Sequence, residues 1–76
     1  MEERVKKIMA DVFLLDISEI NENSSPDSIP QWDSIGHLNL VTAIEEEFGI
    51  KIEDDQITQM LNFKLVVEII KESQQA

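Results

Sequence analysis

The sequence contains no cysteine and few residues that carry positive charge. Without cysteine the chain has no disulfide framework, no thiolate metal site and no thiol nucleophile. The 76 residues include 16 Asp and Glu but only 6 Lys and Arg, which gives a formal net charge of −10. This shortage of cations argues against nucleic acid, because contacts to phosphates require Lys and Arg. The carboxylates instead favour partners with basic surfaces.

Long apolar runs are also missing. No stretch approaches the roughly 20 apolar residues that cross a bilayer, and the N-terminus lacks the basic residue and apolar run of a secretory signal. A chain of 76 residues makes one domain and leaves too little material for a deep enzyme pocket. We therefore expect a cytoplasmic protein without a membrane span, a monomer of one domain over residues 1–76, and not an enzyme.

The few cations are unevenly distributed. Between Ile8 and Ile50 there is no Lys or Arg, whereas the same span holds nine Asp and Glu. One interpretation is an acidic surface that docks on a basic partner. The alternative is a solvated surface that only keeps the protein in solution.

Apolar residues recur at helical spacing and predict an all-α fold. The spacing indicates longer helices over residues 2–15, 34–48 and 63–73 and a short helix over 56–61. Residues 16–33 are rich in Asn, Ser, Asp and Pro, which is typical of a loop. We predict a small four-helix bundle, with three longer helices, one short helix and a long loop between the first two helices.

The same spacing predicts which side chains face the core. In the second helix the expected inner stripe is Ile35, Leu38, Val41, Ile44 and Phe48. The residues expected to hold the loop against the bundle are Ile17, Ile20, Ile29 and Trp32. In the first helix Phe13 and Leu14 are expected to widen the apolar face. The short helix is expected to be capped by Asp54 or Asp55 and to bury Ile57, Met60 and Leu61.

The stretch from Trp32 to Leu38 joins the loop to the second helix. Asp33 has the chemistry of an N-cap, because its carboxylate can accept the unpaired N–H groups of the first turn. Ser34 then begins the helix, with its hydroxyl at the positive end of the helix dipole, where a phosphate is favoured. The plainest interpretation of these two residues alone is helix capping.

Two other kinds of chemistry are not expected. Asp33, Ser34 and His37 are the residue types of a hydrolase triad, but three residues within one helical turn do not give its geometry. His37 is expected to be a partly exposed helix residue that contacts a phosphate on Ser34 when protonated. The acidic runs 45–47 and 53–55 lack the ligand spacing of a calcium loop, so no dedicated metal site is expected.

The motif Asp33-Ser34-Ile35, with Glu45-Glu46-Glu47-Phe48-Gly49-Ile50 at the end of the same helix, resembles the acyl carrier protein family. The resemblance covers nearly the whole chain. It implies that Ser34 carries a 4′-phosphopantetheine arm, transferred from coenzyme A by a separate phosphopantetheinyl transferase. The thiol of the arm would hold an acyl group as a thioester, which explains how a chain without cysteine could carry such a group.

The resemblance also assigns roles to neighbouring residues. Asp33 would cap the helix and help the transferase to recognise the motif. The residues implied in partner binding are Trp32, Ile35, Leu38, Glu45, Glu46 and Glu47. The partners would be acyl-loading, condensing or acyl-transfer enzymes with basic docking surfaces, in fatty-acid, polyketide or related biosynthesis.

The sequence departs from the common fatty-acid carriers, which have Leu-Gly-x-Asp-Ser-Leu here and acids soon afterwards. Trp32 precedes the motif, and Gly36 and Asn39 stand where acids are expected. We interpret Gly36 as permitting close approach of a partner or of the arm. The Trp-Asp-Ser run is more similar to stand-alone carriers of specialised pathways. An aminoacyl or peptidyl carrier, and an unmodified acidic adaptor that binds a basic partner through the second helix, remain as alternatives.

Overall fold

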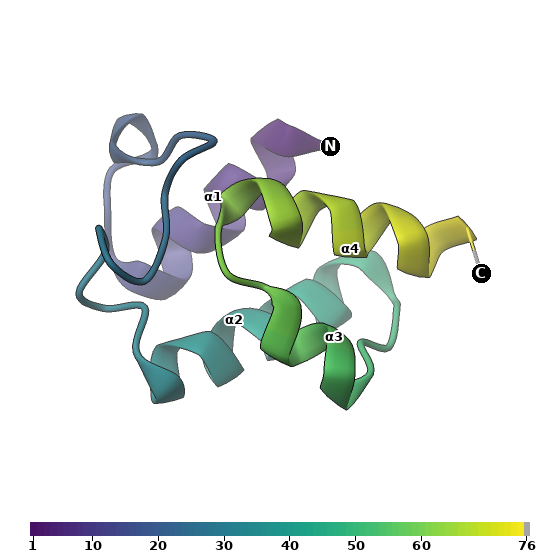
Figure 1. The fold of residues 1–76 in the computed structure, drawn as a ribbon. Helices are drawn as coiled ribbons and strands as arrows, with labels where there is room; N and C mark the ends of the chain where they lie inside the picture. The colour runs from purple at the N-terminus through teal and green to yellow at the C-terminus, as the bar shows by residue number, and fades with distance from the viewer. Residues whose placement is uncertain (76) are drawn as a thin grey trace.

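A computed structural model describes residues 1–75 of the protein and is all-helical over that range (Figure 1). The elements are α1 (Glu2–Phe13), the short 3₁₀ helix η1 (Ile17–Glu19), α2 (Ser34–Phe48), α3 (Asp54–Gln59) and α4 (Phe63–Gln75). The predicted fold class, three longer helices and one short helix, is confirmed. None of the helices in this range is long and apolar enough to span a bilayer.

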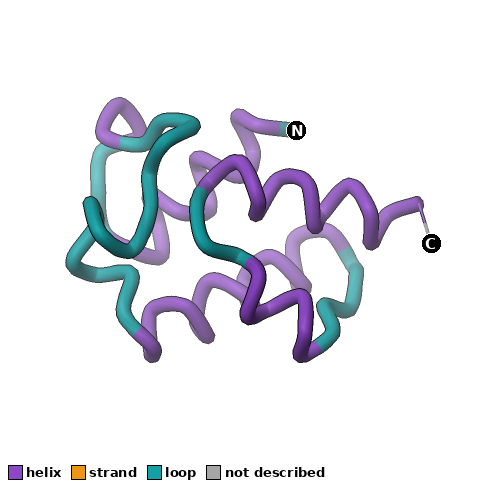
Figure 2. The backbone as a smooth tube through the Cα atoms, in the orientation of Figure 1, coloured by secondary structure: helices purple, strands orange, loops and turns teal. Residues whose placement is uncertain are grey.

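A hydrophobic core holds the helices together. α1 packs against α2, and the loop between them lies at the end of the molecule away from the C-terminus (Figure 2). The largest fully buried side chains are Phe13, Phe63, Met9, Leu40, Ile44, Met60 and Ile70. They come from α1, α2, α4 and the residue that follows α3, so neither η1 nor α3 contributes a fully buried large side chain.

The first helix ends two residues earlier than predicted. Leu14 adopts a left-handed conformation, with φ 57° and ψ 46°, and its N–H bonds to the carbonyl of Ala10. Its side chain is 88% exposed, so the expectation that Leu14 widens the apolar face of α1 is wrong. At the end of α2, Gly49 occupies the same backbone region, as predicted, with φ 63°.

The long loop is held by fewer apolar residues than expected and by one polar residue. Ile20, Ile29 and Trp32 are buried, but Ile17 is 41% exposed and does not hold the loop. Ser24 is 4% exposed. Its hydroxyl accepts the N–H of Asn21 at 2.9 Å, and its carbonyl accepts the N–H of Phe63 at 2.8 Å. The carbonyl of Ser24 in the loop therefore caps the first turn of α4, although Ser24 and Phe63 are 39 positions apart in sequence.

The buried face of α2 also differs from the predicted stripe. It runs through Gly36, Leu40, Val41 and Ile44, whereas Ile35 is 73% exposed and Leu38 59% exposed. The apolar pattern did not predict this face because its first buried residue is Gly36, and a glycine has no apolar side chain to indicate a core position. The prediction that Ile35 and Leu38 face the core is wrong.

The short helix α3 is also capped differently from the prediction. Glu53 is its N-cap, and the Glu53 N–H donates to Oε1 of Gln56 at 2.9 Å. The helix therefore begins two residues earlier than predicted. Met60 is buried, but Leu61 is 62% exposed, which corrects its expected burial.

Candidate functional site

Ser34 is the first residue of α2, and its side chain is exposed. Asp33 precedes it in an extended conformation and accepts the N–H of Gly36 on its Oδ1 at 2.8 Å. The expected N-cap is thus present. Because the cap orients the start of the helix, the Ser34 hydroxyl lies at the end where the helix dipole favours negative charge.

Gly36 is buried beneath the chain segment that leads to Ser34. A Cβ atom at this position would lie 2.1 Å from the backbone oxygen of Gln31, which is closer than real Cβ contacts allow. Our interpretation of Gly36 as room for a partner or an arm is therefore wrong. The close approach is made by the protein's own backbone, and it fixes residues 31–33 against the first turn of α2.

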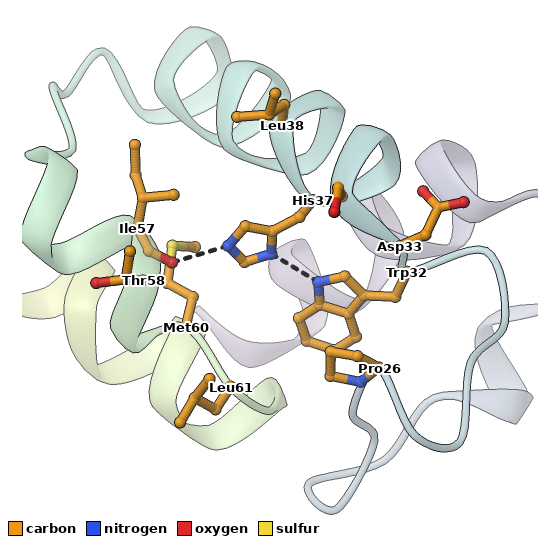
Figure 3. Close-up of a pocket in the computed structure, with 10 residues that line it drawn as sticks. Pro26, Trp32, Asp33, His37, Leu38, Ile57, Thr58, Met60 and Leu61 are labelled. Atoms are coloured by element: carbon orange, nitrogen blue, oxygen red, sulfur yellow. Dashed lines mark hydrogen bonds between the residues drawn. The ribbon is translucent and has the colours of Figure 1, made fainter.

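A pocket of about 610 Å³ opens beside Ser34, between the loop, α2 and the segment around α3 (Figure 3). Its apolar lining includes Leu38, Ile57, Met60 and Leu61. The Thr58 hydroxyl is also in the lining but donates to the carbonyl of Asp55 at 2.8 Å. The pocket therefore presents mainly apolar surface next to the exposed hydroxyl.

The imidazole of His37 bridges two walls of this pocket (Figure 3). Trp32 Nε1–H donates to Nδ1 of His37 at 2.8 Å, and Nε2 of His37 lies 2.8 Å from the carbonyl oxygen of Ile57. An indole N–H can only donate and a carbonyl can only accept. The imidazole is therefore neutral in this arrangement, with its proton on Nε2, and both nitrogens are engaged within the chain.

This bridge bears on two expectations about His37 and Trp32. His37 was expected to contact a phosphate on Ser34 when protonated; in this arrangement it is neutral, and its nitrogens bind Trp32 and Ile57. Trp32 was expected to bind partners, but it is 2% exposed and stacks on Phe13 with ring centroids 5.6 Å apart. In this structure Trp32 supports the pocket from within the core and offers almost no surface to a partner.

Three exposed apolar side chains lie near Ser34. Ile35 follows it directly, and Leu38 and Leu61 line the pocket beside it. Their exposed fractions are 73%, 59% and 62%. We call these three residues the apolar rim. Exposed large apolar side chains gathered at one place are typical of a binding surface.

The acidic end of α2 is partly occupied by contacts within the protein. Glu45 accepts the N–H of Ile52 on Oε2 at 2.8 Å. Glu47 pairs with Arg4 at 2.9 Å, with both side chains about half exposed, and the Arg4 guanidinium lies 4.4 Å from the ring centroid of Phe48. Carboxylates at a helix C-terminus are unfavourable unless compensated, and these contacts compensate two of them. Glu46 is exposed and makes no such contact in the part of the chain that the structure describes.

The geometry does not form a triad or a metal cluster. Asp33 bonds to Gly36 and His37 bonds to Trp32 and Ile57, so neither is arranged to activate the Ser34 hydroxyl. Over residues 1–75, no three His, Asp or Glu side chains are grouped to hold a metal ion.

Sequence reasoning missed the bridge, although a signal was present. A tryptophan in a loop must find an acceptor for its N–H when it is buried, and His37 stands five positions after Trp32. No comparable signal marked Ile57, because any residue could supply the carbonyl. Ser24 was also missed, since the sequence around it reads as an ordinary turn.

No protein-family model matches the chain, but individual proteins do. The acyl carrier proteins of Sinorhizobium fredii (strain NBRC 101917 / NGR234) and Rhizobium meliloti (strain 1021) are each 38% identical over 72 residues, 95% of this chain and 92% of theirs. That of Nitratidesulfovibrio vulgaris (strain DP4) is 32% identical over 74 residues, 97% of both chains. The solution structure of holo acyl carrier protein from Geobacter metallireducens shares the fold, with a TM-score of 0.86 and 22% identity over 96% of this chain and 84% of that one. The chain belongs to the acyl carrier protein family.

Proposed function

We propose that this protein carries acyl intermediates as thioesters on a 4′-phosphopantetheine arm attached to Ser34. As a member of the acyl carrier protein family it is a carrier and not an enzyme. The observation that carries the assignment of Ser34 is the exposure of its side chain at the first position of α2. A separate phosphopantetheinyl transferase must reach this hydroxyl, and the exposure of Ser34 permits that approach.

The surroundings of Ser34 suit a phosphodiester. The N-terminus of a helix offers unpaired N–H groups and a positive dipole end, and both favour negative charge. The nearby carboxylate of Asp33 already accepts the Gly36 N–H, which offsets part of its repulsion toward a phosphate. When bound, the arm supplies the thiol that the chain itself lacks.

The pocket beside Ser34 favours an acyl cargo over an aminoacyl cargo. Leu38, Met60 and Leu61 give it apolar walls, and the imidazole of His37 has no free nitrogen. A charged amino group that entered would lose hydration against these apolar walls, and Asp33 is the only carboxylate among the lining residues. This observation supports the acyl carrier over the aminoacyl or peptidyl alternative.

The surface around the site indicates the kind of partner. The apolar rim would contact acyl-loading, condensing or acyl-transfer enzymes, and Glu46 is the carboxylate best placed to meet a basic docking surface, because Glu45 and Glu47 are engaged within the chain. The uncharged first half of α2, with Gly36 and Asn39, supports a specialised pathway over housekeeping fatty-acid synthesis. We propose that the chain acts in the cytoplasm as one carrier domain.

Intact mass spectrometry tests the proposal. The protein is incubated with coenzyme A, magnesium and a broad-specificity phosphopantetheinyl transferase, beside a known carrier as positive control. We expect one phosphopantetheine on the wild type, none on Ser34→Ala, and one on Ser28→Ala, whose exposed hydroxyl lies in the loop. Failure of the wild type to gain mass while the known carrier does would favour the unmodified adaptor.

A further inference from the structure

The end of α3 receives a hydrogen bond from another helix. α3 has only 6 residues, and a helix this short is not stable by itself. The carbonyl of Ile57, in its last turn, accepts the N–H of Met60 at 3.3 Å but not the N–H of Leu61, which bonds to Gln59 instead, so it lacks the regular i+4 donor of a helix. Nε2 of His37 reaches it from α2 at 2.8 Å, across 20 positions of sequence.

The other side of the same imidazole holds the segment that leads to Ser34. Trp32 is 2% exposed, so its indole N–H has little access to water and needs an acceptor within the protein. Nδ1 of His37 provides it at 2.8 Å, and the planes of the two rings are inclined by only 18°, as an in-plane N–H···N bond requires. One neutral side chain thus joins the segment before Ser34 to the last turn of α3 (Figure 3).

We propose that His37 is a positioning residue that sets the shape of the pocket beside Ser34. Its two hydrogen bonds fix the distance between the pocket wall at Trp32 and the pocket wall at Ile57. They thereby keep Met60 and Leu61 close to the hydroxyl of Ser34. The proposal rests on the function proposed for Ser34, because only that function makes the shape of this pocket matter to a bound group.

Two substitutions separate the two halves of the bridge. His37→Asn places its amide near the position of Nδ1, so it can still accept from Trp32 but is too short to reach Ile57. His37→Gln is longer and can donate to Ile57, but it loses the acceptor near Trp32. Trp32→Phe removes the indole donor and keeps an aromatic ring in the core.

Hydrogen exchange of the unmodified protein measures the effect on α3. In His37→Asn we expect exchange over residues 54–61 to rise about tenfold, as for the loss of a hydrogen bond that limits local opening. In His37→Gln and Trp32→Phe it should stay within about threefold of the wild type, and exchange in α1 and α4 should not change in the two His37 variants. Equal exchange over residues 54–61 in His37→Asn and the wild type would overturn the proposal.

A second measurement needs no variant. Nitrogen NMR of the wild type at pH 8, where an ordinary imidazole is neutral, should show the proton of His37 on Nε2 and Nδ1 as an acceptor. A proton on Nδ1, or rapid exchange between the two tautomers, overturns the bridge even if His37→Asn fails to fold.

The mass spectrometry experiment distinguishes a failure of this proposal from a failure of the function proposed for Ser34. A mass gain in the wild type together with unchanged exchange in His37→Asn means that Ser34 is the attachment site and His37 does not position the pocket. No mass gain together with increased exchange means that the bridge holds α3 but does not serve a carrier.

Discussion

The two ends of α2 differ in what their side chains contact. At the N-terminal end, Asp33, Gly36 and His37 all bond to or pack on nearby parts of the chain, and Ser34 is left exposed. At the C-terminal end, the carboxylates of Glu45 and Glu47 are bound by Ile52 and Arg4.

The comparison shows how one helix can serve as both site and scaffold. At the N-terminal end, the contacts of Asp33, Gly36 and His37 fix the surroundings of the Ser34 hydroxyl. The positive end of the helix dipole stays available there for a negative group. The C-terminal end carries charges that oppose the dipole, so it needs partners to hold them. Of its three carboxylates, Glu45 and Glu47 each make a contact within the protein, and Glu46 makes none in the described chain.

The largest loss of stability is expected when a substitution separates the first turn of α2 from residues 31–33. Gly36→Ala places a Cβ 2.1 Å from the Gln31 oxygen, so the loop or the helix must shift. We expect the free energy of unfolding to fall by about 2 kcal/mol, as for overpacking, although alanine favours helices. Urea unfolding measures this change. A variant as stable as the wild type would show that residues 31–33 are not fixed against α2.

The glycine at the other end should matter for a different reason. A Cβ on Gly49 would meet nothing within 4 Å, but its φ of +63° is unfavourable for residues with a side chain. We expect Gly49→Ala to cost about 1 kcal/mol, and Gly49→Asn to cost less because Asn tolerates this conformation. The same unfolding experiment applies. If Gly49→Asn is no better than Gly49→Ala, the cost is not set by the backbone.

The acidic residues themselves can be compared directly. Glu45→Ala leaves the N–H of the buried residue Ile52 without its acceptor, so we expect a loss of roughly 0.5–1 kcal/mol. Glu46→Ala, one position along, should change stability by less than about 0.5 kcal/mol. Thermal unfolding of the two variants checks this difference. Equal melting temperatures would mean that the Glu45 contact does not stabilise the fold.

The smallest effect is expected for the exposed ion pair. Arg4 and Glu47 have side chains 54% and 50% exposed, and such pairs contribute little in water. Arg4→Met keeps an apolar stem over Phe48 and removes the charge, so we expect a loss below about 0.5 kcal/mol that disappears in roughly 1 M salt. Melting temperatures at low and high salt provide the test. A loss that persists in high salt would instead indicate packing over Phe48.

Sequence reasoning succeeded where the signal was local. The start of α2 at Ser34, its cap at Asp33 and its end at Gly49 all follow from residue types within one turn of each boundary. It succeeded for Val41 and Ile44 on the buried face of α2 but failed for Ile35 and Leu38, because the buried Gly36 gives no apolar signal. It also failed for Leu14 and Leu61, which are apolar at helical spacing but lie where a helix has already ended.

The sequence by itself determined four helices, their approximate ends and a serine at the N-terminus of the second helix, because periodicity and capping depend on neighbours along the chain. Only the tertiary structure decided that His37 joins Trp32 to Ile57 and that Glu45 binds the N–H of Ile52. A hydrogen bond requires two atoms within about 3 Å. Which distant groups come that close depends on how the helices pack against one another.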